Sequence, residues 1–201
     1  VQVEKSPANL VLYLASLRAG AVYLPLNTAY TLSEVGYFVG DAEPGLIVCD
    51  PAARGGMEEL ASLSGARVET LDGAGQGSLA DLAAGQAGGF ATIPRADDDL
   101  AAIVYTSGTT GRSKGAMLTH ANLASNARTL VKAWRFTDAD VLIHALPIYH
   151  VHGLFVAINV LLAAGGTMIF LPKFDAGEIV GLMPRATTLM GVPTFYTRLL
   201  K

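Results

Sequence analysis

Residues 105–115 are the segment in which residue types and spacing point most clearly to chemistry. The segment reads YTSGTTGRSKG and combines three glycines, several hydroxyl side chains and Lys114. Glycines let the backbone turn tightly so that its N–H groups approach an anion, hydroxyls add donors, and a lysine adds a mobile positive charge. These residues therefore predict a loop that cradles a polyphosphate.

The spacing within this loop differs from that of a Walker A loop, the G-x-x-x-x-G-K-[ST] sequence of many nucleotide hydrolases. That motif needs adjacent Gly and Lys, whereas two residues separate Gly111 from Lys114. Residues 116–119 also have the pattern of a strand, not of the helix that follows a Walker A loop. The segment is therefore not a Walker A loop. A nucleotide hydrolase that releases orthophosphate and a solvated loop without a ligand are the alternatives.

Two further candidates, His150 and His152, lie two positions apart. On an extended segment they would face the same side, which also permits a metal site. Zinc needs at least a third ligand, and His144, His120 and Cys49 show no ligand spacing, so zinc is disfavoured. An imidazole can instead donate a hydrogen bond to a carboxylate or carry charge near neutral pH. A hydrogen-bonded structural role is an open alternative for His152, and we interpret His144 as structural.

Apolar residues at helical and at strand spacing alternate along the chain. The expected helices are 9–19, 31–39, 51–64, 79–84, 121–134, 153–164, 176–183 and one that begins near 194. The expected strands are 21–26, 45–49, 68–71, 100–105, 116–119, 141–145, 167–171 and 187–191. Strands this apolar, separated by helices, predict an α/β fold with mostly parallel sheets covered on both faces. Ligands in such sheets bind beyond the carboxyl ends of strands, where the loop after residue 105 lies.

A change in pattern near residue 90 predicts a domain boundary. Glycines at positions 73, 75, 77, 85, 88 and 89 interrupt the alternation, which then resumes after an acidic run at 97–99. We therefore expect two α/β subdomains, residues 1–90 and residues 91–201, of which the second carries the phosphate loop.

Composition narrows the possible partners and the compartment. The 201 residues contain 14 Lys and Arg against 17 Asp and Glu, a formal net charge of −3, so a basic surface for nucleic acid is not expected. Residues 151–171 are apolar, but Gly165 and Gly166 divide them into pieces shorter than the roughly 20 residues that a membrane span needs. Cys49 is the only cysteine, as expected in a reducing compartment, and we predict a cytoplasmic protein, with a targeting segment before residue 1 left open.

Several motifs in this order resemble those of the adenylate-forming superfamily, which includes acyl-CoA synthetases, luciferases and peptide-synthetase adenylation domains. The segment YTSGTTGRSKGAMLTH is similar to the signature of the superfamily, and LRAGAVYLPL and LPIYHVHG are similar to its early and later motifs. Together these motifs span nearly the whole chain. The resemblance implies that the two subdomains belong to the large N-terminal domain of such an enzyme.

The resemblance also implies a reaction and roles for individual residues. ATP and a carboxylic acid would form an acyl adenylate and pyrophosphate, with Mg²⁺ as cofactor, and CoA would then displace AMP. Lys114 and His150 would be catalytic, with His150 beside the acid, Lys173 would contact CoA or be an ordinary surface lysine, and Thr106 would lie on the magnesium side. The remaining phosphate ligands would be Ser107, Gly108, Thr109, Thr110 and Gly111. One departure is Ser113, where many relatives have proline.

The wording of the motifs is most similar to that of malonyl-CoA and methylmalonyl-CoA synthetases. Arg112 and His152 are compatible with an acid that carries a second carboxylate, and no carboxylate follows Tyr149 to hold an amino-acid ammonium group. A synthetase for a medium- or long-chain monocarboxylic acid and a non-catalytic nucleotide-binding fragment are the alternatives. The chain begins without methionine and lacks later motifs of the family, so we expect a fragment that is inactive without its missing C-terminal portion.

Overall fold

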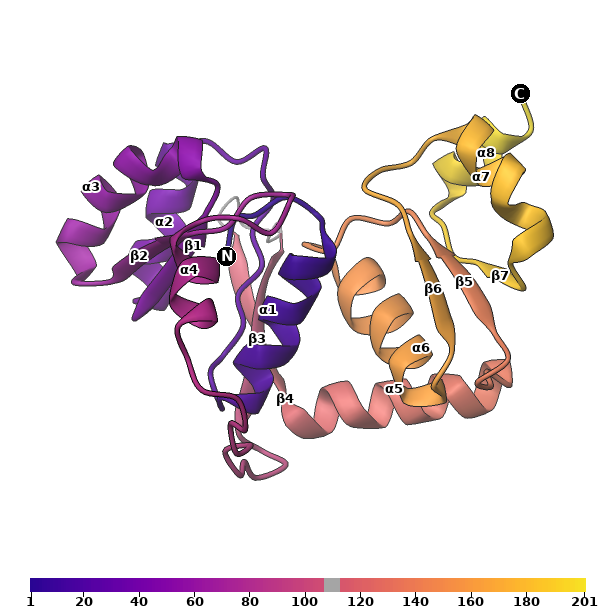
Figure 1. Cartoon of the computed structure of the whole chain (residues 1–201), viewed down its shortest axis with the longest axis horizontal. Coiled ribbons are helices and arrows are strands. Elements are labelled where there is room, and N and C mark those ends of the chain that lie inside the picture. Colours follow the sequence, from indigo (N-terminus) through magenta and orange to yellow (C-terminus); the bar gives the residue numbers. More distant parts are fainter. Residues whose placement is uncertain (107–112) are drawn as a thin grey trace. The chain divides into compact units, whose positions relative to one another are not determined.

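The structure of the protein is a computed structural model that describes residues 1–106 and 113–201, except the side chain of Leu63 (Figure 1). Two compact units can be distinguished. Unit 1 comprises Val1–Pro94 and the described residues of Tyr105–Gly115, and unit 2 comprises Arg95–Val104 and Ala116–Lys201. The boundary expected at residue 90 stays a prediction.

Unit 1 alternates helices with a pair of parallel strands. Its elements are α1 (Pro7–Arg18), α2 (Leu32–Ala42), β1 (Leu46–Cys49), the 3-10 turn η1 (Pro51–Ala53), α3 (Arg54–Ser64), β2 (Arg67–Thr70) and α4 (Ser78–Ala84). β1 pairs with β2 so that Leu46 lies opposite Arg67 and Cys49 opposite Thr70. The expected helices and strands of this region are therefore present, apart from the strand expected at residues 21–26, between α1 and α2.

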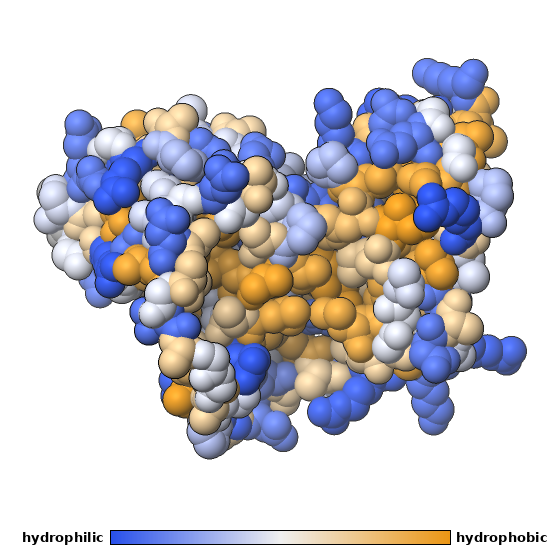
Figure 2. Space-filling view, in the orientation of Figure 1, coloured by the Kyte–Doolittle hydropathy of each residue, from blue (hydrophilic) through white to orange (hydrophobic). Residues whose placement is uncertain are grey.

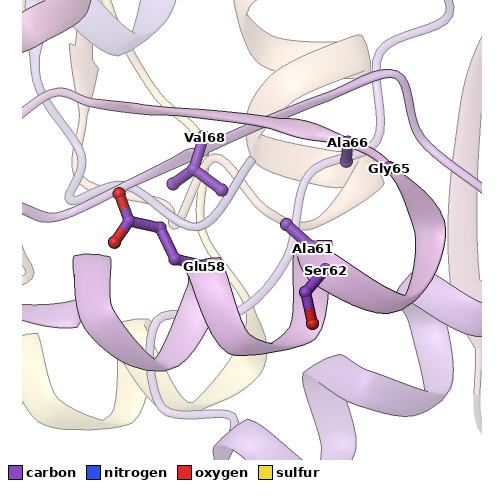
Figure 3. A pocket seen from close by; sticks show the side chains of 6 residues that line it. All are labelled: Glu58, Ala61, Ser62, Gly65, Ala66 and Val68. Carbon is purple, nitrogen blue, oxygen red and sulfur yellow. The ribbon is translucent and has the colours of Figure 1, made fainter.

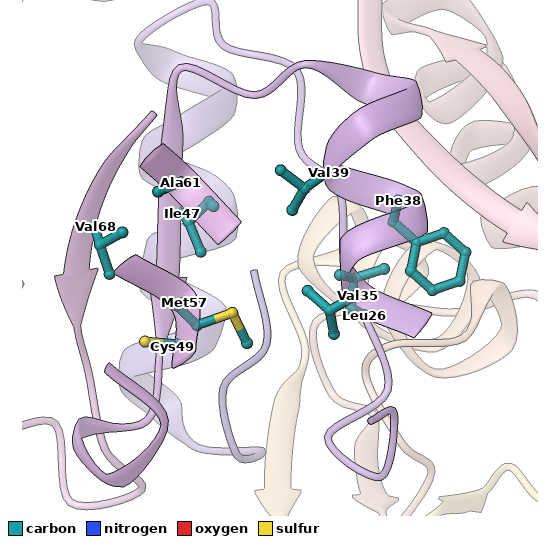
Figure 4. Packing of buried hydrophobic residues seen from close by; sticks show 9 residues of the cluster. All are labelled: Leu26, Val35, Phe38, Val39, Ile47, Cys49, Met57, Ala61 and Val68. Atoms are coloured by element: carbon teal, nitrogen blue, oxygen red, sulfur yellow. The ribbon is translucent and has the colours of Figure 1, made fainter. Parts of the chain in front are cut away.

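Helix α2 is fixed both at its first turn and along one face. Thr31 and Glu34 form a capping box, in which the Thr31 hydroxyl accepts from the Glu34 N–H at 3.4 Å and the Glu34 carboxylate accepts from the Thr31 N–H at 2.8 Å. The same helix buries Val35, Phe38 and Val39 in the core of unit 1. Figure 4 shows this core, in which α2 faces residues of β1, β2 and α3.

The strand expected at 21–26 is absent, and the segment forms an isolated bridge at Tyr23 instead. Two hydrogen bonds connect it to the first residue: the Val1 nitrogen donates to the Leu24 carbonyl at 2.7 Å, and the Leu26 N–H donates to the Val1 carbonyl at 2.8 Å. Pro25 lies between them and has no N–H to continue a ladder. The apolar run was therefore a correct sign of burial at Tyr23 and Leu26, but a wrong sign of a strand.

Unit 2 contains a three-stranded parallel sheet and the helices that cover it. Its elements are β3 (Leu100–Thr106), β4 (Lys114–Thr119), α5 (His120–Trp134), β5 (Val141–His144), the π-helical segment η2 (His152–Ile158), α6 (Asn159–Ala164), β6 (Thr167–Phe170), α7 (Ala176–Leu182), the 3-10 turn η3 (Met183–Arg185), β7 (Thr188–Leu189) and α8 (Pro193–Leu199). The first two strands pair with each other and extend into unit 1. The sheet has the order β6-β5-β7, with Val141 opposite Thr167 and Leu142 opposite Thr188.

Both faces of the central strand β5 are buried. Successive side chains of a strand point to opposite faces. Leu142 packs with Ala157 and Leu161 of the η2 and α6 region, whereas Ile143 packs with Ile179 of α7. The predicted α/β fold with mostly parallel strands is confirmed.

Apolar surface is also present. Large hydrophobic side chains that are exposed include Val11, Phe90, Met117, Val180 and Leu200. Figure 2 shows hydrophobic areas between hydrophilic ones on the visible face of the molecule. None of the helices in the described ranges is long and apolar enough to cross a membrane.

The helix expected from residue 153 begins as the π-helical segment η2, and its start is held by a close backbone contact. A Cβ placed on Gly153 would lie 2.0 Å from the Pro147 carbonyl oxygen, so only glycine allows the two backbones to approach this closely. The Gly153 carbonyl in turn lies 2.9 Å from Nε2 of the buried His144. Gly153 therefore fixes residues 147–153 against the end of β5.

Substitution of this glycine tests the close contact. We expect Gly153→Ala to lower the free energy of unfolding by about 2 kcal/mol, because the methyl group meets backbone rather than a flexible side chain. Gly181→Ala on α7 is the matched control, since nothing lies within 4 Å of its Cβ position, and it should be neutral or stabilising by up to about 1 kcal/mol. Urea unfolding followed by circular dichroism measures both, and equal effects would contradict the role given to Gly153.

Candidate nucleotide and acid site

The predicted phosphate loop is described at its two ends only. Thr106 is exposed at the carboxyl end of β3, and Lys114 is exposed at the first position of β4. Outside the described residues lie six predicted site residues: Ser107, Gly108, Thr109, Thr110, Gly111 and Arg112. The strands are longer than the expected 100–105 and 116–119, so Thr106 is the last residue of β3 and Lys114 the first of β4, and the two strands pair with each other.

Helix α2 contacts the residues next to both ends of the loop. The Tyr105 hydroxyl donates to the Asp41 carboxylate at 2.5 Å, and the Tyr37 hydroxyl donates to the Ser113 carbonyl at 2.8 Å. Burial and the Asp41 carboxylate raise the pKa of Tyr105 above its ordinary value, so this phenol stays a donor at neutral pH. Sequence analysis missed Tyr37 and Asp41. The expected helix ended at residue 39, so Asp41 lay outside it, and nothing in the sequence indicated what Tyr37 contacts.

The histidine segment follows β5 in unit 2. His150 is exposed, and its ring lies 4.6 Å from the ring of Tyr149, whereas His152 is half-buried at the first position of η2. Residues 148–151 form turns and the start of a helix instead of an extended segment. The extended segment on which His150 and His152 would face the same side is therefore not present. No group of three or more His, Cys, Asp or Glu side chains that could hold a metal occurs in residues 1–106 and 113–201.

His144 and Lys173 have different environments. His144 is buried, and its ring stacks on that of Phe170 at 5.3 Å, which agrees with a structural role. Lys173 is exposed three residues after the end of β6. Because β5 and β6 are parallel and His144 lies opposite Phe170, the segments that carry His150 and Lys173 leave the sheet at the same edge. This is the edge at which ligands bind in α/β sheets.

The predicted site residues that the structure describes thus fall into two groups, Thr106 and Lys114 in unit 1, and His150, His152 and Lys173 in unit 2. A separate pocket of about 270 Å³ lies between α3 and β2 (Figure 3). Its lining consists of Glu58, Ala61, Ser62, Gly65, Ala66 and Val68. None of the predicted site residues that the structure describes lines this pocket, in which three aliphatic side chains lie together with Glu58 and Ser62.

Comparisons with known proteins place the chain in a family. Residues 1–201 match the family described as AMP-binding enzyme. The whole chain superimposes on ATP-bound MatB from Rhodopseudomonas palustris with a TM-score of 0.97 and 69% sequence identity, and covers 40% of that chain. It superimposes with a TM-score of 0.75 and 33% identity on a malonyl-CoA ligase ternary product complex with methylmalonyl-CoA and AMP bound, covering 98% of this chain and 40% of that one.

Curated sequences agree with the structural comparison. The "Malonate--CoA ligase" of Arabidopsis thaliana is 34% identical over 214 residues, which is 99% of this chain and 35% of the relative. The chain therefore spans little more than a third of the length of that relative. The resemblance predicted from the motifs is confirmed. The chain belongs to the AMP-binding enzyme family.

Proposed function

We propose that this chain is part of an acid:CoA ligase that activates malonate or methylmalonate with ATP. The observation that carries the proposal is the loop rich in glycine and hydroxyl side chains between β3 and β4, with Thr106 and Lys114 at its ends. The likeness of the whole chain to ATP-bound MatB supports the use of ATP, and the product complex supports CoA as the second substrate.

In the first half-reaction, a carboxylate oxygen of the acid attacks the α-phosphorus of ATP. A new P–O bond forms, the bond to the bridging oxygen of the β-phosphate breaks, and pyrophosphate leaves. Because two anions must meet, the protein has to neutralise charge and hold the geometry. Lys114 supplies positive charge. The backbone N–H groups and hydroxyls of Ser107, Gly108, Thr109, Thr110 and Gly111 donate to the phosphates.

Magnesium fits this arrangement. Mg²⁺ prefers oxygen ligands, keeps several waters and commonly binds through one or two protein groups together with substrate phosphates. The exposed Thr106 hydroxyl at the end of β3 is such an oxygen. When bound, the ion would offset negative charge on the departing pyrophosphate.

In the second half-reaction the thiol of CoA gives up its proton to solvent and its sulfur attacks the acyl carbon. A thioester bond forms, and AMP leaves with the electron pair of the broken C–O bond. We assign His150 to hydrogen bonding with the acid carboxylate and Lys173 to contact with CoA. Both residues are exposed and follow the carboxyl ends of neighbouring strands. We assign Arg112 and His152 to the second carboxylate of the acid.

The names of the relatives favour a dicarboxylic acid over the alternative of a medium- or long-chain monocarboxylic acid. The proposed partners are the acid, ATP, CoA and a C-terminal portion of the same protein, in line with the length of the relatives. A cytoplasmic location stays a prediction.

The reaction type can be tested by isotope exchange with the full-length protein. We expect labelled pyrophosphate to enter ATP only when the acid is present, because formation of the acyl adenylate is reversible. AMP should accumulate once CoA is added. Release of orthophosphate without AMP would instead favour a nucleotide hydrolase and would contradict the proposal.

Loss of the Lys114 charge tests the phosphate site. We expect Lys114→Ala to lower kcat/KM for adenylation by about ten- to a thousand-fold, roughly 1.4 to 4 kcal/mol, because its charge matters most as negative charge develops on pyrophosphate. Lys132→Ala, which removes an exposed lysine from the last turn of α5, is the matched control. Equal rates for the two variants would remove Lys114 from the site.

Substrate preference tests the identity of the acid. We expect malonate or methylmalonate to give a higher kcat/KM than acetate or octanoate, and His152→Ala to reduce the rate with malonate more than the rate with acetate. The ratio of the malonate rate to the acetate rate is taken within one variant, so a loss of stability affects both rates alike and cancels. A preference for octanoate would refute the dicarboxylic acid, and equal losses would remove His152 from contact with the second carboxylate.

A further inference from the structure

Helix α2 holds both sides of the phosphate loop through two side chains that sequence analysis did not single out. Tyr37 donates its hydroxyl hydrogen to the carbonyl of Ser113 at 2.8 Å, and Asp41 accepts a hydrogen bond from Tyr105 at 2.5 Å. Tyr105 directly precedes Thr106, and Ser113 directly precedes Lys114. The two bonds therefore act one residue away from the two described side chains predicted to face the nucleotide.

We propose that Tyr37 and Asp41 are positioning residues, which set the placement of Lys114 and Thr106 for adenylation by fixing the two ends of the loop. This inference rests on the proposed function, because it assigns α2 to the ATP half of that reaction. According to this inference, α2, which is distant from the loop in sequence, helps to position the residues that bind the phosphates.

The geometry of α2 suits this role. Tyr37 and Asp41 are four residues apart, so they lie on the same face, one turn from each other. Between them, Phe38 is buried and its ring lies 4.5 Å from the ring of Tyr105. Tyr37 also meets Tyr105 edge to face, with ring centroids 6.2 Å apart. One turn of α2 thus packs on Tyr105 and hydrogen-bonds both ends of the loop.

Helix α2 is itself firmly held, so it can serve as a reference for the loop. Its first turn has the capping box of Thr31 and Glu34, and its apolar face belongs to the core of unit 1 (Figure 4). Catalytic groups need support from neighbours whose own conformations are locked, since small displacements reduce transition-state stabilisation. A hydrogen bond to the Ser113 carbonyl restrains the peptide group that leads directly into Lys114.

Hydroxyl deletions test the two bonds while keeping the rings. The variants are Tyr37→Phe and Tyr105→Phe in the full-length enzyme, with Tyr30→Phe as the control. Tyr30 belongs to the same aromatic cluster, with its ring 5.1 Å from that of Phe38, but its hydroxyl has no hydrogen-bond partner among the described residues. Asp41→Ala, alone and combined with Tyr105→Phe, asks whether these two residues act through one bond.

We expect Tyr37→Phe and Tyr105→Phe to lower kcat/KM for ATP in pyrophosphate exchange by about fivefold, as the loss of one hydrogen bond predicts, while Tyr30→Phe stays near the wild type. Thioester formation from preformed acyl adenylate and CoA should be unchanged in all variants, because that step has no pyrophosphate to bind. The melting temperature should also stay close to that of the wild type. Asp41→Ala should add little to Tyr105→Phe, because both remove the same bond.

Two results would overturn the inference while the wild type still exchanges pyrophosphate. One is that Tyr37→Phe and Tyr105→Phe match Tyr30→Phe in exchange. The other is that both half-reactions and the melting temperature fall together, which is what a purely structural role predicts. If the wild type shows no acid-dependent exchange, the proposed function fails, and calorimetric titration with Mg-ATP then decides the role of α2: weaker binding in Tyr37→Phe than in Tyr30→Phe supports it, and equal binding refutes it.

Discussion

Burial of strand β5 on both faces and both edges is the constraint on which unit 2 depends. Its neighbours β6 and β7 pair with its two edges, and helices cover its two faces, so Leu142 and Ile143 are both fully buried. A strand in this position has no solvated side, which is why Val141, Leu142 and Ile143 are apolar in succession. Because all three strands are parallel, whatever follows them emerges at one edge. The arrangement of His150 and Lys173 is a consequence of that polarity, not of any contact between them.

The elements of the fold could be predicted because their signals are local. The pattern of apolar residues located nearly every helix and strand to within a few residues, and the helix expected from residue 31 differs by one residue from the observed start of α2. The segment 21–26 was predicted wrongly because burial and strand formation give the same apolar run. The π-helical form of η2 was missed because apolar spacing distinguishes helix from strand and not one kind of helix from another, and the close approach of Gly153 to the Pro147 carbonyl leaves no trace in that spacing.

The chemistry of the site was predictable only where the residue types themselves indicate a role. Residue types in the 106–114 loop indicate their role directly, since glycines, hydroxyls and a lysine together suit phosphates. Tyr37 and Asp41 indicate nothing by themselves, because their role depends on Tyr105 and Ser113, more than sixty residues away. An exposed carboxylate such as Asp41 also opposes anion binding, so charge alone argues against placing it beside this loop. Its hydrogen bond to Tyr105 accounts for its position, and water screens much of the repulsion.

The lone thiol of Cys49 has a practical consequence for spectroscopy. Cys49 is completely buried at the end of β1, and burial raises the pKa of its thiol above the ordinary value. Reagents that modify thiolates at neutral pH therefore react poorly with Cys49, because its thiol is inaccessible to solvent and protonated. The native cysteine should therefore react little with thiol-directed dyes or spin labels. A cysteine introduced on the exposed side of α5 or α7 would carry the label by itself, without removal of the native one.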